Sequence, residues 1–279
     1  MGVALDALLD MHTIREGAVR LAHEAGQKIL EIYASDFEVT AKADTSPVTA
    51  ADLASQEHIV QGLRGLTPEL QVIAEESDPP PFDERQGWSR FWLVDPLDGT
   101  KEFVKRNGEF SVNIALVEGG YPILGVVHAP VTGLTYVGTP KSRHTQAAAW
   151  RYDAEGNAHP IHVRPPEPGS VKVMVSRSHA NAPTREFIDA LTQRFGQVET
   201  IPRGSAIKSC LVADGTAHYY PRLGPTMWWD TAAAQAVLIA AGGEMLAEDG
   251  SGPLRYGGEN IGNPPFVAVY SVEAFLPET

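Results

Sequence analysis

The chain has 279 residues, and its 22 lysines and arginines against 35 aspartates and glutamates give a formal charge of −13. Hydrophobic residues make up 43% of the sequence, which is enough for a folded core and argues against a disordered chain. The acidic balance disfavours binding to a nucleic-acid polymer or to an anionic membrane surface, because both partners would be repelled. The single cysteine, Cys210, cannot form a disulfide within the chain, which excludes a disulfide-stapled fold.

The first 17 residues do not resemble a signal peptide, because Asp6 and Asp10 interrupt their only apolar run and no basic leader precedes it. No stretch of the sequence approaches the roughly 18 consecutive apolar residues that a membrane-spanning helix needs. We therefore expect a cytoplasmic protein without a membrane span. Peripheral binding at the cytoplasmic face of the inner membrane stays open, and so does the choice between a monomer and a homodimer.

The first half of the chain predicts two helices and then a series of strands. Apolar residues recur every three to four positions from Thr13 to Tyr33, which is typical of an amphipathic helix. A second helix is expected over Ala50–Leu66. Its candidate core residues are Leu53, Ile59, Val60 and Leu63. Strands are expected where short apolar runs lie between turn residues, at Val72–Ala74, Phe91–Val94, Ser111–Val117, Ile123–His128, Thr135–Val137 and Ala147–Tyr152.

A proline-rich segment, Val163–Ser170, predicts a linker, and the pattern changes after it. Helices and short strands alternate there, which indicates a layered α/β arrangement. The strands are expected at Val171–Val175 and Ala217–Tyr220, and the helices at about Thr184–Phe195, Ala206–Ala213 and Thr231–Ala241. We therefore expect an α+β to α/β layered sandwich with two subdomains, residues 1–160 and residues 161–279.

Two carboxylates, Asp95 and Asp98, follow an apolar run that predicts a buried strand. Pro96 between them restricts one backbone angle, and Gly99 after them permits a turn that a side chain would block. Such a turn can direct Asp95, Asp98 and the carbonyl of Leu97 toward one point. These are hard oxygen ligands of the kind that Mg²⁺ prefers. The same residues also fit an exposed turn, since Asp, Pro and Gly are common in turns.

Gly99 and Thr100 add a second feature to this segment. If they begin a helix, their backbone amides face outward and can bind a phosphate oxygen. A metal site and a phosphate-binding site would then share one turn.

The run Trp92–Thr100 reads W-L-V-D-P-L-D-G-T, with Glu75-Glu76 before it and Trp229–Ala233 (W-D-T-A-A) after it. Together these motifs resemble the inositol monophosphatase superfamily of Mg²⁺-dependent, lithium-sensitive phosphatases. The three motifs occur in the order of that family, so the resemblance covers most of the chain. Four further stretches are similar to its CysQ branch of 3′(2′),5′-bisphosphate nucleotidases, at Ser46–Asp52, Thr100–Phe103, Lys105–Phe110 and Ser176–Ala180.

The resemblance implies a site for two or three Mg²⁺ ions. The implied ligands are Glu75, Asp95, the carbonyl of Leu97, Asp98 and Asp230. The resemblance also implies that Thr100 donates a hydrogen bond to Asp52 and that this catalytic pair orients and deprotonates a metal-bound water. Without the resemblance, Glu75 also fits an acidic loop, and Asp52 and Asp230 also fit ordinary helix starts.

The resemblance further implies that the second subdomain binds the nucleoside and its 5′-phosphate. The residues implied for substrate binding are Glu75, Leu97, Asp98, Gly99, Thr100, Ser176, His179, Ser205, Lys208 and Asp230. Ser205 and Lys208 lie at an expected helix start, where a lysine and backbone amides can meet a phosphate. His179 equally fits a turn, and Lys208 a surface position. Lys101 and Arg106 fit either phosphate contacts or solvated charges.

We therefore expect a Mg²⁺-dependent nucleotidase that hydrolyses adenosine 3′,5′-bisphosphate to AMP and phosphate, with 3′-phosphoadenylyl sulfate as a further candidate substrate. Such an enzyme would clear a by-product of sulfate activation. Two alternatives stay open. One is an inositol monophosphatase or broad sugar-phosphate phosphatase, which the continuation Lys101–Phe103 disfavours. The other is a catalytically silent metal- or nucleotide-binding regulator, which the joint presence of the implied catalytic and metal residues disfavours.

Overall fold

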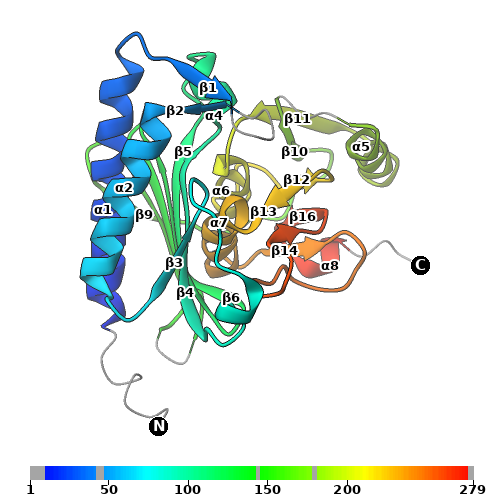
Figure 1. Ribbon diagram of the computed structural model, residues 1–279. Helices are drawn as coiled ribbons and strands as arrows, with labels where there is room; N and C mark the ends of the chain where they lie inside the picture. Colours follow the sequence, from blue (N-terminus) through cyan, green and yellow to red (C-terminus); the bar gives the residue numbers. More distant parts are fainter. Residues whose placement is uncertain (1–9, 42–46, 143–144, 178–180, 276–279) are drawn as a thin grey trace.

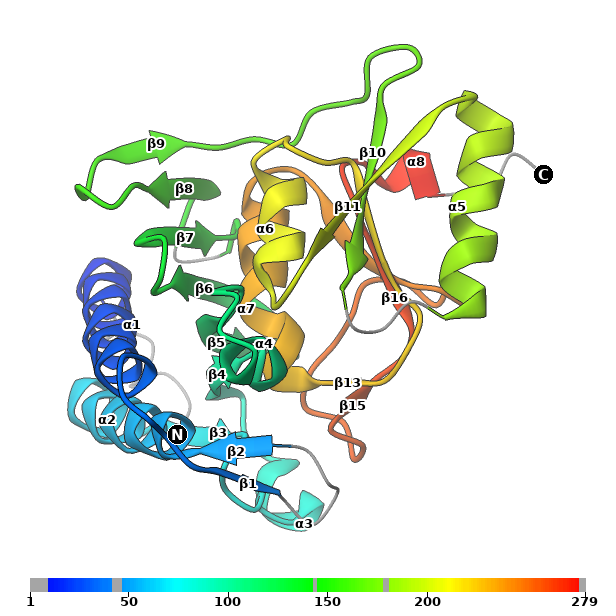
Figure 2. The ribbon, with the colours of Figure 1, turned by 90° about the horizontal axis from the view of Figure 1, so that it is seen from above.

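The computed structural model describes residues 10–41, 47–142, 145–177 and 181–275 and arranges them in alternating layers of helices and sheets. Figures 1 and 2 show the layers in the order helix, sheet, helix, sheet, helix. The helices are α1 (Met11–Tyr33), α2 (Ala50–Leu66), α3 (Phe82–Arg85), α4 (Thr100–Val104), α5 (Ala182–Phe195), α6 (Ile207–Ala213), α7 (Trp228–Ala240) and α8 (Val272–Phe275).

The first sheet has seven strands that are neighbours in chain order. They are β3 (Gln71–Ala74), β4 (Arg90–Asp98), β5 (Ser111–Glu118), β6 (Tyr121–Ala129), β7 (Leu134–Thr139), β8 (Ala148–Tyr152) and β9 (Ala158–Pro160). The pairing of β3 with β4 is parallel, and every later pairing is antiparallel. Parallel pairing brings the carboxyl ends of β3 and β4 to the same edge of the sheet.

The second sheet has five strands in the order β11-β10-β12-β16-β14. They are β10 (Val171–Ser176), β11 (Val198–Arg203), β12 (Tyr219–Arg222), β14 (Glu244–Ala247) and β16 (Phe266–Val269). Two short pairs complete the fold, β1 (Val39–Ala41) with β2 (Pro47–Thr49), and β13 (Thr226–Met227) with β15 (Gly262–Asn263). In the described part of the chain, no helix is both long and apolar enough to cross a membrane.

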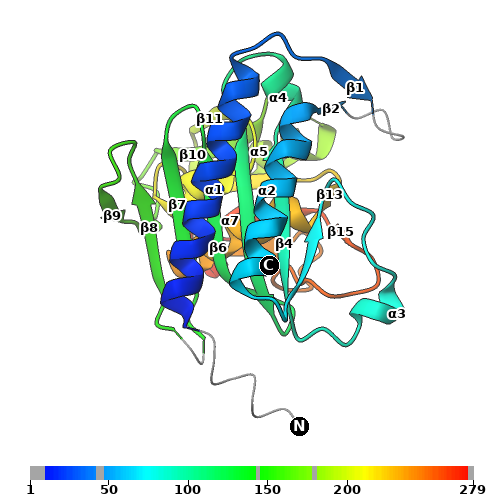
Figure 3. The same ribbon diagram turned by 60° about the vertical axis from the view of Figure 1, so that its left-hand side comes forward.

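The helices α1 and α2 cover one face of the seven-stranded sheet, as Figure 3 shows. The three-to-four spacing of α1 buries Ile14, Leu21 and Ile29 against this face, which confirms the predicted amphipathic helix. In α2, Ile59 and Leu63 are fully buried, as predicted. The prediction for Leu53 is wrong, because this side chain is 54% exposed on the outer face of the helix.

The layered fold expected from the sequence is confirmed, and each helix and strand predicted above has a counterpart in the structure. Three strands of the second sheet, β11, β14 and β16, were not predicted. β11 is an edge strand with mostly exposed residues, so it lacks an apolar run. The sheets are built from residues 71–160 and 171–269, on either side of the predicted linker. The division into two subdomains stays a prediction, since α7 packs against both sheets.

The central helix α7 is buried on nearly all sides between the two sheets. Its run of alanines gives it a thin, apolar surface, which is typical of a fully buried helix. Two glycines let it approach the first sheet closely. A Cβ at Gly125 of β6 would lie 2.1 Å from the carbonyl oxygen of Ala233, and one at Gly138 of β7 would lie 2.3 Å from the Cα of Val237. The position of α7 therefore depends on these glycines.

We expect Gly138→Ala to destabilise the protein by about 1–3 kcal/mol, because the added methyl group would overlap the backbone of α7. The matched control is Gly65→Ala on α2, where a Cβ meets nothing within 4 Å and alanine favours the helix by up to about 1 kcal/mol. Urea unfolding of both variants measures the difference. Equal stability of the two variants would contradict the close contact between β7 and α7.

Candidate active site

The carboxyl end of β4 supplies the first acidic side chains of the site. β4 extends beyond the predicted Phe91–Val94 and continues to Asp98 through a register shift in its pairing with β5. The side chain of Asp95 accepts a hydrogen bond from the amide of Leu97 at 3.0 Å. Gly99 follows with a φ angle of 99°, which favours glycine, and α4 begins at Thr100. The turn expected from Pro96 and Gly99 is therefore a bulge joined to a short helix.

Four carboxylates from β4, the end of β3 and α7 influence one another. Burial raises the pKa of Asp95 well above its usual range, and the charges of Glu75, Asp98 and Asp230 raise it further. Asp230 lies inside the first turn of α7, not before the helix as expected, and accepts a hydrogen bond from the amide of Met227 at 2.8 Å. The fold thus brings acidic side chains from distant parts of the sequence to one place.

This donor set suits Mg²⁺. Carboxylate and carbonyl oxygens are its preferred ligands, and Mg²⁺ usually takes one or two carboxylates while keeping several waters. Among the described residues, no group of three or more His, Cys, Asp or Glu side chains is arranged so that it could hold a metal ion by itself. The oxygen donors fit Mg²⁺ in kind, and a site built from them would be completed by water and substrate oxygens. The full predicted ligand set of Glu75, Asp95, Leu97, Asp98 and Asp230 stays a prediction.

Asp52 and Thr100, the predicted catalytic pair, are in contact. One carboxylate oxygen of Asp52 accepts hydrogen bonds from the amide and the hydroxyl of Thr49, at 2.7 and 2.6 Å, at the start of α2. This leaves the other oxygen for the hydroxyl of Thr100, at 3.1 Å. The Thr100 hydroxyl also lies 3.3 Å from the carbonyl oxygen of Leu97. Burial raises the pKa of Asp52, although the hydrogen bonds from Thr49 and Thr100 offset part of the effect.

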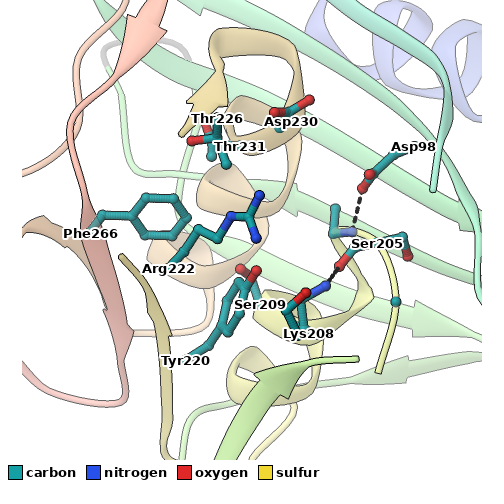
Figure 4. A pocket seen from close by; sticks show the side chains of 13 residues that line it. Asp98, Ser205, Lys208, Ser209, Tyr220, Arg222, Thr226, Asp230, Thr231 and Phe266 are labelled. Carbon is teal, nitrogen blue, oxygen red and sulfur yellow. Dashed lines mark hydrogen bonds between the residues drawn. The ribbon is translucent and has the colours of Figure 1, made fainter. Parts of the chain in front are cut away.

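A small pocket with a cavity volume of about 90 Å³ lies beside the acidic group. Asp98 and Asp230 line it together with three of the predicted substrate-binding residues, Ser176, Ser205 and Lys208. These residues come from β4, α7, β10 and the start of α6, and Figure 4 shows most of them around the pocket.

The pocket also contains two cations. Lys208 is 4% exposed, and its ammonium group donates to the carbonyl oxygen of Ser205 at 2.5 Å and lies 5.1 Å from the ring centre of Tyr220. Burial lowers the pKa of Lys208 to about 8, although the charge of Asp98 acts in the opposite direction. Arg222, at the end of β12, points into the pocket (Figure 4). Its charge lowers the pKa values of both Asp230 and Lys208, so the acidic and the cationic groups are close neighbours.

Asp98 connects the two sets of charges. Its carboxylate accepts a hydrogen bond from the amide of Ala206 at 2.5 Å and one from the side chain of Asn113 at 3.3 Å. Burial raises the pKa of Asp98, and the nearby charge of Lys208 and the Ala206 amide partly offset this. A carboxylate of the first sheet is thus held by a turn of the second half of the chain.

Some site residues differ from the sequence-based interpretation. Arg222 was missed, because an arginine after a short strand carries no recognisable pattern. Arg106 is not free for phosphate, since its guanidinium donates to the carbonyl oxygens of Tyr33 and Ser35 at the end of α1 and lies 4.8 Å from the ring centre of Phe37. His179 lies outside the described residues.

Comparison with known proteins gives a consistent result. The model of the inositol monophosphatase family matches residues 10–270. The 3′(2′),5′-bisphosphate nucleotidase CysQ of Escherichia coli K12 is 48% identical over 255 residues, which cover 90% of this chain and 98% of that protein. The protein of the same name from Haemophilus influenzae is 32% identical over 267 residues, 94% of each chain.

Solved structures show the same relationship. The crystal structure of CysQ from Bacteroides thetaiotaomicron has a TM-score of 0.81 and 36% identity, covering 94% of this chain and 98% of that chain. The Thermotoga maritima inositol monophosphatase TM1415 has a TM-score of 0.72 at 23% identity, covering 93% of this chain and 92% of that chain, which is a likeness in fold. The chain therefore belongs to the inositol monophosphatase family.

Proposed function

We propose that the protein is a Mg²⁺-dependent phosphatase that removes the 3′-phosphate of adenosine 3′,5′-bisphosphate and releases AMP. The observation that carries this proposal is a single pocket with carboxylates on one wall, Asp98 and Asp230, and two cations, Lys208 and Arg222, within it. A metal site accounts for one phosphate group of such a substrate, and the cations account for a second. The names of relatives at 48% and 36% identity support the same substrate class.

The metal site would be formed by the carboxylates Glu75, Asp95, Asp98 and Asp230 and the carbonyl of Leu97. When bound there, Mg²⁺ supplies charge neutralisation for the phosphate and lowers the pKa of water. The protein is strongly acidic, with a formal charge of −13, so an anionic substrate needs local positive charge to enter the site. Two or three ions remain part of the proposal, and the amides of Gly99 and Thr100 remain candidates for holding the phosphate being cleaved.

Asp52 and Thr100 would accept the proton of the attacking water. The Thr100 hydroxyl directs its hydrogen toward Asp52, at 3.1 Å, and so leaves its oxygen lone pairs available to a water molecule. Asp52 is a suitable final proton acceptor, because burial raises the pKa of its carboxyl and so makes the carboxylate a stronger base. Thr49 keeps the other carboxylate oxygen fixed and so sets the direction of transfer.

Lys208 and Arg222 would bind the 5′-phosphate. Lys208 is a buried ammonium group at the start of α6, and Arg222 offers a planar fork that suits a phosphate. Ser176 and Ser205, also at this pocket, add polar groups for the nucleotide. A substrate with one phosphate would give these cations no second phosphate to bind, which favours the bisphosphate over inositol 1-phosphate. A cytoplasmic location and a role in sulfur metabolism are also part of this proposal.

We expect Mg²⁺-dependent release of phosphate from adenosine 3′,5′-bisphosphate and much slower release from inositol 1-phosphate, and no release from either in EDTA. The reason is that only the nucleotide offers a second phosphate to the cations. A colorimetric phosphate assay on both substrates measures this. Preference for inositol 1-phosphate would overturn the substrate assignment but keep the metal site, whereas no release from either would favour a silent binding protein.

We expect Arg222→Ala to reduce kcat/KM for adenosine 3′,5′-bisphosphate about tenfold to a hundredfold, which corresponds to the loss of a charged hydrogen bond. Adenosine 3′-phosphate, which lacks the second phosphate, should be affected far less. Arg255→Ala is the matched control, because Arg255 is an exposed arginine that stacks on Tyr121 outside the pocket. An equal loss on both nucleotides would mean that Arg222 does not bind the 5′-phosphate.

A further inference from the structure

Glu109 lies in the loop between α4 and β5 and connects three parts of the site. One of its carboxylate oxygens accepts hydrogen bonds from the amide of Gly204 at 2.8 Å and from Arg177 Nε at 3.0 Å. The other accepts one from Arg177 Nη2 at 2.7 Å, with Arg203 at 3.8 Å. The Glu109 side chain is only 18% exposed. It thus ties a loop of the first sheet to the ends of β10 and β11 in the second.

The backbone of the same loop is pressed against two turns of the site. A Cβ at Gly204 would lie 2.4 Å from the carbonyl oxygen of Glu109, and one at Gly99 would lie 3.1 Å from the same atom. The loop at Glu109 therefore lies in close contact with both the bulge at the end of β4 and the turn between β11 and α6. The side chain and the backbone of Glu109 thus both contact the turn at Gly204.

The turn that Glu109 holds carries contacts to both kinds of charge in the pocket. Ser205 adopts a left-handed conformation with φ of 52°, which a residue with a side chain keeps only when its surroundings hold it there. Its carbonyl oxygen receives the ammonium group of Lys208, and the next amide, of Ala206, donates to Asp98. The place of the cation relative to the carboxylates is thus set by this turn.

We infer that Glu109 is a positioning residue that holds the Gly204–Ala206 turn and thereby sets the distance between the metal-binding carboxylates and the Lys208 cation. This inference rests on the proposed function, in which these two groups bind the two phosphates of one substrate. Glu109 therefore acts on the preference for a substrate with two phosphates. It does not contact the reacting atoms. Burial alone would raise the pKa of Glu109, but the hydrogen bonds and charge of Arg177 outweigh it, and the pKa lies below the usual value, so the carboxylate is charged when it accepts these bonds.

The test compares adenosine 3′,5′-bisphosphate with adenosine 3′-phosphate in the full-length protein. Glu109→Ala is expected to raise KM for the bisphosphate about tenfold, while kcat/KM for the monophosphate changes less than about threefold. Glu109→Gln keeps an acceptor for the Gly204 amide and should retain most of the preference. If Glu109→Ala lowers kcat/KM equally for both substrates, the inference is overturned and Glu109 has a general structural role. A lower KM for the bisphosphate in Glu109→Ala would also overturn the inference. It would mean that Glu109 only screens the positive charges of Arg177 and Arg203.

Glu118→Ala is the matched control. Glu118 pairs with Arg90 at 2.5 Å and is 17% exposed, close to the value for Glu109, but it lies at the opposite end of β5 from the site. Its loss should lower stability without changing the ratio of the two substrates. A changed ratio in this control would mean that any weakened ion pair alters the preference, which would overturn the specific role of Glu109.

A double-mutant cycle with Lys208→Met tests whether Glu109 acts through Lys208. In the Lys208→Met background, Glu109→Ala should have little further effect on KM for the bisphosphate, because residues that act through one contact are not additive. Full additivity would overturn the inference while leaving the proposed function intact. A wild-type protein without preference for the bisphosphate would instead contradict the proposed function, and this inference with it.

Discussion

The site depends on keeping several carboxylates close together at the end of β4, with Asp95 out of water. Asp95 is buried there, and Glu75, Asp98 and Asp230 are near enough to raise its pKa further. Burying uncompensated charges costs several kcal/mol each, so such a group persists only where hydrogen-bond donors or cations offset the repulsion. The backbone amides of Leu97 and Met227 offset part of the repulsion. The negative charge that they leave uncompensated makes the group suited to Mg²⁺.

The same constraint explains the construction of the second half of the chain. Asp230 reaches the site because α7 lies between the sheets, and α7 fits there because alanines and the glycines of β6 and β7 permit close contact. The turn at Ser205 approaches from the second sheet, where one of its amides holds Asp98 and one of its carbonyls holds Lys208. Acidic and cationic groups are thus positioned by a single set of hydrogen bonds that crosses from one sheet to the other.

Much of this site could be predicted from the sequence, but not all of it. Asp52 and Thr100 were predicted as a pair, and the structure places them in hydrogen-bond contact. Ser176, Ser205 and Lys208 line one pocket with Asp98 and Asp230, although these residues come from distant parts of the chain. Arg222 could not be predicted, because nothing in a short strand end distinguishes a ligand-binding arginine from a solvated one. Arg106 is the reverse case. It lies next to a sequence motif of the site, but its guanidinium binds backbone carbonyl oxygens at the end of α1.

The sequence by itself determined the layered fold class, most helices and strands and the family, because hydrophobic periodicity and the order of short motifs are local properties. Only the tertiary structure decided which charges face each other. That Leu53 is exposed, that Asp230 lies within the first turn of α7 and that Glu109 joins the two halves all follow from packing between distant segments. Such contacts depend on how layers stack, and no local pattern of residues encodes them.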